Sequence, residues 1–205
     1  MNFLQTLTFK ELIMLYDFVL RSLYHAGQQK EENFRLVLKS LTLSNLYKKE
    51  KDRFTRLVIV QREEERKVLS LAELVFLKWE IEKALFSGKP EKVSWSQGDE
   101  EISLWIEEDR LVLEVMGGGD IARLKLSNPE YLRILATTIE TMQVWDAVYP
   151  IKDDRFELVR AKPFALLTVK KEPPLLLKLG RYPVLTMAIL SVHALKEKLY
   201  SSPLE

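Results

Sequence analysis

The sequence predicts an α+β protein made of tandem antiparallel ββββα repeats, with the helices packed on one face of curved sheets. Three stretches share the order strand, tight turn, strand and amphipathic helix: Arg53–Leu85, Arg110–Met142 and Pro163–Leu199. They recur at a period of roughly 55 residues, and an internal repeat constrains topology more strongly than single-residue propensities do. A reduced version, one strand and one helix, opens the chain.

The opening segment is expected to hold a short strand over residues 3–9 and a helix over Lys10–Tyr24. The helix is predicted from apolar residues that recur three and four positions apart. Thr8 with Glu11 forms a capping box at its start. The polar residues that follow Gly27 are expected to end it.

The first repeat is predicted from residues 34–86. Residues 34–47 form one long strand or two strands joined near Lys39 and Ser40, and strands at 54–61 and 67–71 follow. Ser70 and Glu73 form a second capping box, which opens a helix that ends at Phe86. Residues 87–90 read Ser-Gly-Lys-Pro and mark a boundary. We therefore expect residues 1–88 to hold the opening segment and the first repeat.

The two remaining repeats are expected to form a second part, residues 91–200, followed by a tail at 201–205. Strands are predicted at 93–96, 102–107, 111–116 and 122–126. Ser127 is expected to cap a helix that runs to about Gln143, with Pro129 in its first turn. Further strands are predicted at 147–151, 156–161, 164–170 and 175–179, and a last helix at 182–200. Pro173 and Pro174 indicate an edge strand.

The composition excludes several classes of site. There is no cysteine, so disulfides, zinc–cysteine sites and thiol catalysis are excluded. The chain contains no run of eighteen apolar residues, so no membrane span is predicted. The first residues lack the pattern of a signal peptide. Apolar residues make up 47% and charged residues 30% of the chain. This balance predicts a folded cytoplasmic protein and is typical of a thermophile.

Charge is distributed unequally along the chain, although the net charge is only +1. Residues 1–90 hold 16 Lys and Arg against 12 Asp and Glu, whereas residues 91–205 hold 15 against 18. Neither half has the strong positive excess of a nonspecific nucleic-acid binder. The acidic second half is a candidate surface for a protein partner.

Three motifs resemble one known group of proteins. The stretch from Arg110 reads RLVLEVMGGGDIARLKLSNPEYLRIL, that from Lys67 reads KVLSLAELVFL, and that from Leu177 reads LKLGRYPVLTMAIL. They resemble the repeats of the Pur, Whirly and transcriptional positive-cofactor-four group. The resemblance implies that two four-strand-and-helix units pack into one domain, and that exposed sheet faces bind single-stranded DNA or RNA. A sliding-clamp-like fold is the second possibility.

Basic and aromatic residues on sheet faces would track phosphates and stack on bases in such a protein. The first candidate set comprises Arg35, Lys39, Tyr47, Lys48, Lys49, Arg53, Arg56 and Arg62. Arg35 and Lys39 are expected to share one strand face, and Arg56 and Arg62 to point the same way from the next. The alternative is an ordinary solvated sheet face.

Trp105 alternates with Leu104 and Ile106, so it is expected on the opposite, more polar face of its strand. There it could stack on a base or fill a subunit contact, or it could lie in the core under a helix. Trp95 has the same two interpretations, whereas Trp79 and Trp145 are expected to pack in the core or at helix ends. A second basic set includes Arg155, Arg160 and Lys162.

No motif predicts an enzyme, a metal site or a cofactor. The three glycines at 117–119 precede a strand rather than a helix, so they predict a hairpin turn and not a phosphate loop. His25 and His193 have no ligand or catalytic motif around them. Single-stranded nucleic-acid binding without catalysis is therefore the first hypothesis. A protein–protein scaffold or subunit of a larger complex is the alternative, and a homodimer is compatible with both.

Overall fold

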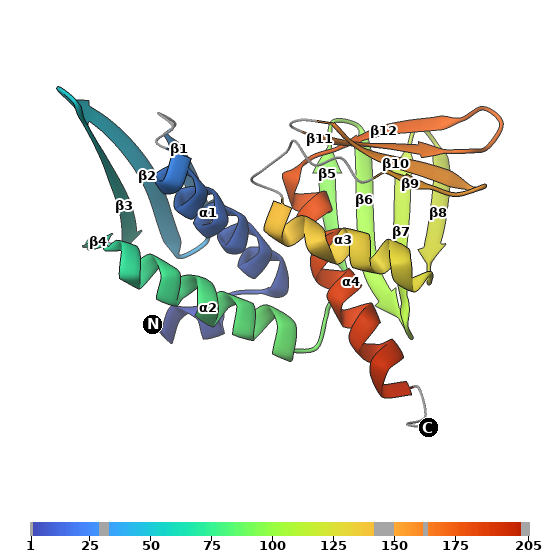
Figure 1. Cartoon of the computed structure of the whole chain (residues 1–205), viewed down its shortest axis with the longest axis horizontal. Coiled ribbons are helices and arrows are strands. Elements are labelled where there is room, and N and C mark those ends of the chain that lie inside the picture. Colours follow the sequence, from blue (N-terminus) through green and yellow to red (C-terminus); the bar gives the residue numbers. More distant parts are fainter. Residues whose placement is uncertain (1, 29–32, 142–149, 162–163, 202–205) are drawn as a thin grey trace. The chain divides into compact units, whose positions relative to one another are not determined.

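The computed structural model describes residues 2–28, 33–141, 150–161 and 164–201. The chain divides into two compact units, Met1–Ser87 and Gly88–Glu205 (Figure 1). The described part contains three antiparallel sheets of four strands each, together with four α-helices. The predicted α+β class is therefore confirmed.

The first unit contains one short 3-10 helix, two α-helices and one sheet. The elements are η1 (Asn2–Thr6), α1 (Phe9–Gln28), β1 (Phe34–Leu38), β2 (Leu41–Glu50), β3 (Arg53–Arg62), β4 (Glu65–Leu69) and α2 (Leu71–Ser87). The sheet order is β1-β2-β3-β4, so every strand pairs with its neighbour in sequence. Residues 34–47 thus form two strands, and the turn at Lys39 and Ser40 separates them.

The core of the first unit lies between the sheet and α1. Leu36, Leu43 and Val60 are cross-strand neighbours, and all three are buried because they point toward the helices. The rings of Phe18 on α1 and Phe34 on β1 meet edge to face at 5.2 Å. Helix α2 packs on α1. Its buried residues Leu74, Leu77, Ile81 and Leu85 recur at helical spacing on that side.

Both predicted capping boxes are present. The Thr8 hydroxyl accepts a hydrogen bond from the Glu11 amide, and the Glu11 carboxylate accepts one from the Thr8 amide, each at 3.1 Å. Ser70 and Glu73 make the same reciprocal pair at the start of α2, at 3.1 and 3.3 Å. These local bonds satisfy amides that have no partner inside the helix.

Two local predictions were wrong. Residues 2–6 form a 3-10 helix and not a strand, and the Thr6 hydroxyl donates to the Phe3 carbonyl at 2.7 Å. A single strand has no neighbour to pair with, so local turns satisfy the backbone instead. At the third α-helix, Asn128 rather than Ser127 caps the start, because its side chain accepts from the Glu130 amide at 2.9 Å.

The second unit contains two sheets and two helices. The elements are β5 (Val93–Gln97), β6 (Glu100–Glu107), β7 (Arg110–Gly117), β8 (Asp120–Leu126), α3 (Pro129–Thr141), β9 (Ile151–Lys152), β10 (Phe156–Ala161), β11 (Phe164–Val169), β12 (Leu175–Leu179) and α4 (Arg181–Ser201). The sheet orders are β5-β6-β7-β8 and β12-β11-β10-β9. Strand β12 is an edge strand, as the adjacent prolines predict. The predicted strand residues 147–149 and Trp145 lie outside the described residues.

Helix α4 ends the second unit but packs on its first sheet. It contacts β5, β6 and β7, and it also packs along α3, which it crosses in Figure 1. The Trp95 ring on β5 stacks on Tyr182 of α4 at 4.9 Å, and its indole N–H donates to the Thr186 hydroxyl at 2.9 Å. Trp95 is therefore a core residue, and the alternative of a surface residue that stacks on a base is wrong.

Helix α3 contacts the second sheet in turn. The Tyr131 ring meets Phe156 of β10 edge to face, and its hydroxyl donates to the Lys152 carbonyl at 3.0 Å. Gln97, at the end of β5, accepts from the Gly180 amide at 2.7 Å and donates to the Lys178 carbonyl. Contacts between distant segments therefore hold the second unit together as one body.

Candidate nucleic-acid interface

One face of the β5–β8 sheet packs on α4, and the opposite face is open around a buried centre of Ser103, Val112 and Glu114. The register places four rows of side chains across this open face, and Lys92, just before β5, lies beside them. The rows are Glu107 and Arg110; Trp105, Val112 and Lys125; Ser94, Ser103, Glu114 and Arg123; and Ser96, Glu101, Met116 and Ile121. We call this surface the Trp105 face.

Trp105 is half-buried and has two cations close to its ring. The Lys92 ammonium lies 4.6 Å and the Arg123 guanidinium 5.6 Å from the ring centroid. Both distances are within the range of cation–π attraction. The structure thus places Trp105 on the open face of its sheet, as the alternation in the sequence predicts, and excludes a core position under a helix.

Two carboxylates of the same surface pair with two of its cations. The Glu114 carboxylate accepts two hydrogen bonds from Arg123, at 2.9 and 2.5 Å. Lys125 pairs with Glu107 at 2.7 Å. The hydrogen bond from Lys125, together with its charge, lowers the pKa of Glu107 below its ordinary value. The face therefore presents alternating charges in fixed positions rather than a uniform positive surface.

The remaining positions of the Trp105 face are small or apolar, except for Glu101, which adds an exposed third carboxylate. The Ser94 and Ser103 hydroxyls are hydrogen-bonded at 2.8 Å. Met116 is 42% and Ile121 64% exposed. A half-buried indole beside cations, hydroxyls and exposed apolar side chains can stack on a planar aromatic ring and pair with an anion next to it.

The first predicted basic set does not lie on one face, because the register divides it. Arg35, Lys48 and Arg53 occupy the open face of the β1–β4 sheet, and Lys39 lies in the turn between β1 and β2. Residues of the opposite parity lie on the face that α1 covers: Tyr47, Lys49, Arg56 and Arg62.

Arg56 has a structural contact. It lies directly across from Tyr47 on the helix-covered face, and its guanidinium donates to the Ser22 carbonyl of α1. Burial lowers the pKa of Arg56, and Tyr47 partly offsets this effect. Arg56 therefore joins α1 to the sheet, and it is not displayed for a ligand.

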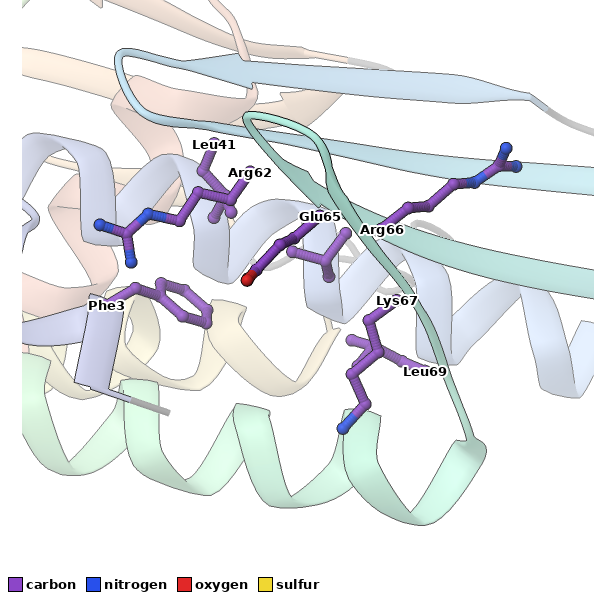
Figure 2. A pocket seen from close by; sticks show the side chains of 8 residues that line it. Phe3, Leu41, Arg62, Glu65, Arg66, Lys67 and Leu69 are labelled. Carbon is purple, nitrogen blue, oxygen red and sulfur yellow. The ribbon is translucent and has the colours of Figure 1, made fainter.

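Arg62 lines a pocket of about 590 Å³ beside η1. Figure 2 shows the side chains of Arg62 and Glu65 near Phe3, whereas that of Arg66 points away. Lys67, also on the lining, pairs with Glu73 at 2.5 Å. The buried side chains of Leu41 and Leu69 complete the wall. This lining is apolar with mixed charge, so it does not match a phosphate backbone.

The second basic set is only partly described. Arg155 follows β9, and its guanidinium pairs with Asp153 at 3.2 Å. The amide and guanidinium of Arg155 lower the pKa of the Asp153 carboxyl. Lys162 and the side chain of Arg160 lie outside the described residues. The register of β10 puts Arg160 opposite Ala165.

Sequence reasoning missed three residues of the Trp105 face, namely Lys92, Arg123 and Lys125. Arg123 and Lys125 alternate along β8, and this spacing was visible in the sequence. Their position across from Glu114 and Val112 depends on strand pairing, which the sequence did not show. The prediction for Trp79 was wrong, because its side chain is 60% exposed on α2.

Comparisons with known proteins add no relative. No protein-family model matches the chain, and searches of curated proteins and of solved structures find no match. Among the residues that the structure describes, no cluster of three or more His, Asp or Glu could hold a metal ion. Within the same residues, every helix is too short or too polar to span a membrane.

Proposed function

We propose that this protein binds single-stranded DNA or RNA on the Trp105 face and has no catalytic activity. One base stacks on the Trp105 ring, and neighbouring phosphates pair with Lys92, Arg123 and Lys125. The observation that carries the proposal is the half-buried indole on an open sheet face with two cations within 6 Å of its centre. Base stacking on an aromatic side chain is tolerant of sequence, so little sequence preference is expected.

The proposal extends to the architecture. We propose that the segments β1–β4 with α2, β5–β8 with α3, and β9–β12 with α4 are repeats of one Pur- or Whirly-like unit. The element order supports this interpretation. The contacts of α4 with the first sheet of the second unit, and of α3 with the second, support the pairing of the last two repeats into one domain.

The charges of the face limit the affinity. Stacking on one aromatic residue contributes about 1–3 kcal/mol per base. Phosphates must compete with Glu114 for Arg123 and with Glu107 for Lys125, so the electrostatic contribution is smaller than on a uniformly basic face. Two or three phosphate contacts would give a plot of log K against log salt with a slope of about −1.4 to −2.1.

The test is fluorescence anisotropy of labelled single-stranded DNA and RNA titrated with the full-length protein at several salt concentrations. Trp105→Ala should weaken binding by about 5- to 150-fold, the equivalent of 1–3 kcal/mol. Lys92→Ala should weaken it and lower the salt slope by about 0.7. Trp79→Ala removes an exposed tryptophan from the other unit and serves as the control, with unchanged binding.

Loss of binding in a Trp79 variant that keeps the oligomeric state of the unmodified chain, or retention of binding in the Trp105 variant, contradicts the proposed site. Absence of binding at low salt contradicts the proposed function.

A role as a subunit of a larger complex is the second candidate. The observation that favours it is on α2, where Phe76 is 50% and Trp79 60% exposed. A helix with apolar residues all round is normally buried on all sides. The proposed homodimer would use such a surface. Residues 91–205, which carry more acidic than basic residues, remain the proposed site of a protein partner. Sedimentation velocity of the Trp79→Ala variant against the unmodified chain tests the homodimer.

A further inference from the structure

The open face of the β1–β4 sheet is aliphatic at its centre. Ile59 points to this face but is only 5% exposed. Leu57 precedes it by two positions on β3, and Val68 lies directly across from it on β4. Leu46 lies across from Leu57. These neighbours are themselves 39–50% exposed, so together with Ile59 they form a continuous aliphatic stripe. Val37 on β1 is 64% exposed and lies apart from this stripe, across from Thr42.

Cations surround this stripe. Arg35, Arg53 and Arg66 point to the same face, and none of them forms an ion pair within the part of the chain that the structure describes. Lys48 also lies here and pairs with Glu50. The register places one acidic residue among these positions, Glu50. The aliphatic stripe therefore lies within a predominantly positive border.

The aliphatic and basic composition of this face favours one kind of ligand over the others. Nucleic-acid bases stack on aromatic rings, and the positions named above provide aliphatic side chains only. A second copy docked face to face would bring arginines against arginines, which is unfavourable. An acidic amphipathic segment fits both features, because its aliphatic side chains would cover Leu57 and Val68 while its carboxylates reach the arginine forks.

We infer that the open face of the β1–β4 sheet docks an acidic, aliphatic segment of a partner protein. The face lies in the first unit, whereas the Trp105 face lies in the second. The two inferences rest on different residues and can fail separately.

The test starts from a random 16-residue peptide library displayed on phage and selected on the immobilised full-length chain. We expect the enriched peptides to combine Asp or Glu with Leu, Ile or Val, and to exclude Lys and Arg. The most enriched peptide is then synthesised with a fluorophore, and its binding is measured by anisotropy. The double variant R35E/R66E should weaken binding at least tenfold, and Val68→Asp should do the same.

The matched control is Arg133→Glu, which reverses an exposed arginine on α3 in the other unit and should leave binding unchanged. Circular dichroism melting establishes that each variant is folded; R35E/R66E changes only exposed side chains, so it remains informative if Val68→Asp unfolds.

Three outcomes would overturn the inference. In the first, no peptide is enriched, or the enriched peptides bind R35E/R66E as tightly as the unmodified chain. In the second, sedimentation velocity shows a dimer that the R35E/R66E variant loses, which would identify a second copy as the occupant. In the third, R35E/R66E loses oligonucleotide binding while Trp105→Ala retains it, which would assign this face to nucleic acid.

Discussion

Replacing each of two tryptophans by alanine should have very different effects on stability. Trp95 is 6% exposed, whereas Trp79 is 60% exposed. The Trp95 ring stacks on Tyr182, and its N–H donates to Thr186. Because these partners are on α4, Trp95→Ala removes both of these side-chain contacts between β5 and the last helix. The comparison therefore tests whether the end of the chain packs on the β5–β8 sheet.

The magnitude follows from burial. A tryptophan that is almost fully buried removes about 150–250 Å² from water, which at ~25 cal/mol per Å² is about 4–6 kcal/mol. Measured values for such truncations are about 3–5 kcal/mol. No further penalty is expected at Thr186, because its hydroxyl also donates to the Tyr182 carbonyl at 2.7 Å. Trp79→Ala should cost less than about 1 kcal/mol, as surface substitutions usually do.

Urea unfolding followed by far-UV circular dichroism measures both effects. The chain has two compact units, so two transitions are expected, and Trp95→Ala should move only the one that belongs to the second unit. A cost below about 1 kcal/mol for Trp95→Ala would refute the packing of α4 on β5. A cost above about 2 kcal/mol for Trp79→Ala would show that the exposed side of α2 is covered in solution.

Three further changes test the other contacts. Arg56→Met removes the part-buried hydrogen bond to the Ser22 carbonyl and should destabilise the first unit by about 1–3 kcal/mol in urea unfolding. Ser70→Ala removes the cap of α2 and should cost about 0.5–2 kcal/mol. The pKa of Asp109 is lowered chiefly by its hydrogen bond from Lys198. Near pH 7 the unmodified chain should therefore have a higher melting temperature than the Asp109→Asn variant. This difference should begin to fall below about pH 4 and be lost as the pH passes through the lowered pKa of Asp109.

Each of these changes has an outcome that contradicts its reason. Equal stability of the Arg56→Met variant would mean that the guanidinium does not join α1 to the sheet. A Ser70→Thr variant keeps the hydroxyl and should retain most of the stability that Ser70→Ala loses. The melting difference between the unmodified chain and Asp109→Asn should shrink as the pH falls through the lowered pKa of Asp109. A difference that is the same at neutral and at acid pH cannot come from the charge of this carboxylate.

Local chemistry explains which elements the sequence predicted. Apolar spacing identified the helices, and the two capping boxes placed two helix starts correctly, because these bonds join residues three positions apart. The glycines at 117–119 predicted a turn for a local reason as well: Gly118 and Gly119 adopt φ of +59° and +86°, which residues with a Cβ rarely do.

The errors arose where distant contacts decide. Residues 2–6 have a strand-like composition, but no strand is available to pair with them. Trp79 and Trp95 look equally apolar in the sequence, yet one faces solvent and the other lies under α4. The hydrophobicity of a side chain does not predict whether another element will bury it. Burial is determined by how separate elements pack.

The candidate site divides in the same way. Alternation along β6 placed Trp105 on the face opposite Leu104, which is a property of a single strand with period two. Whether Lys92, Arg123 and Glu114 surround it depends on the pairing of β5 with β6, of β6 with β7 and of β7 with β8. The predicted basic set does not form one surface. Arg53 and Arg56 are three positions apart on β3, so their side chains lie on opposite faces of the sheet. The sequence alone therefore determined the α+β class and most element positions, and the tertiary structure alone decided which charged residues meet, since register joins residues that are far apart in the chain.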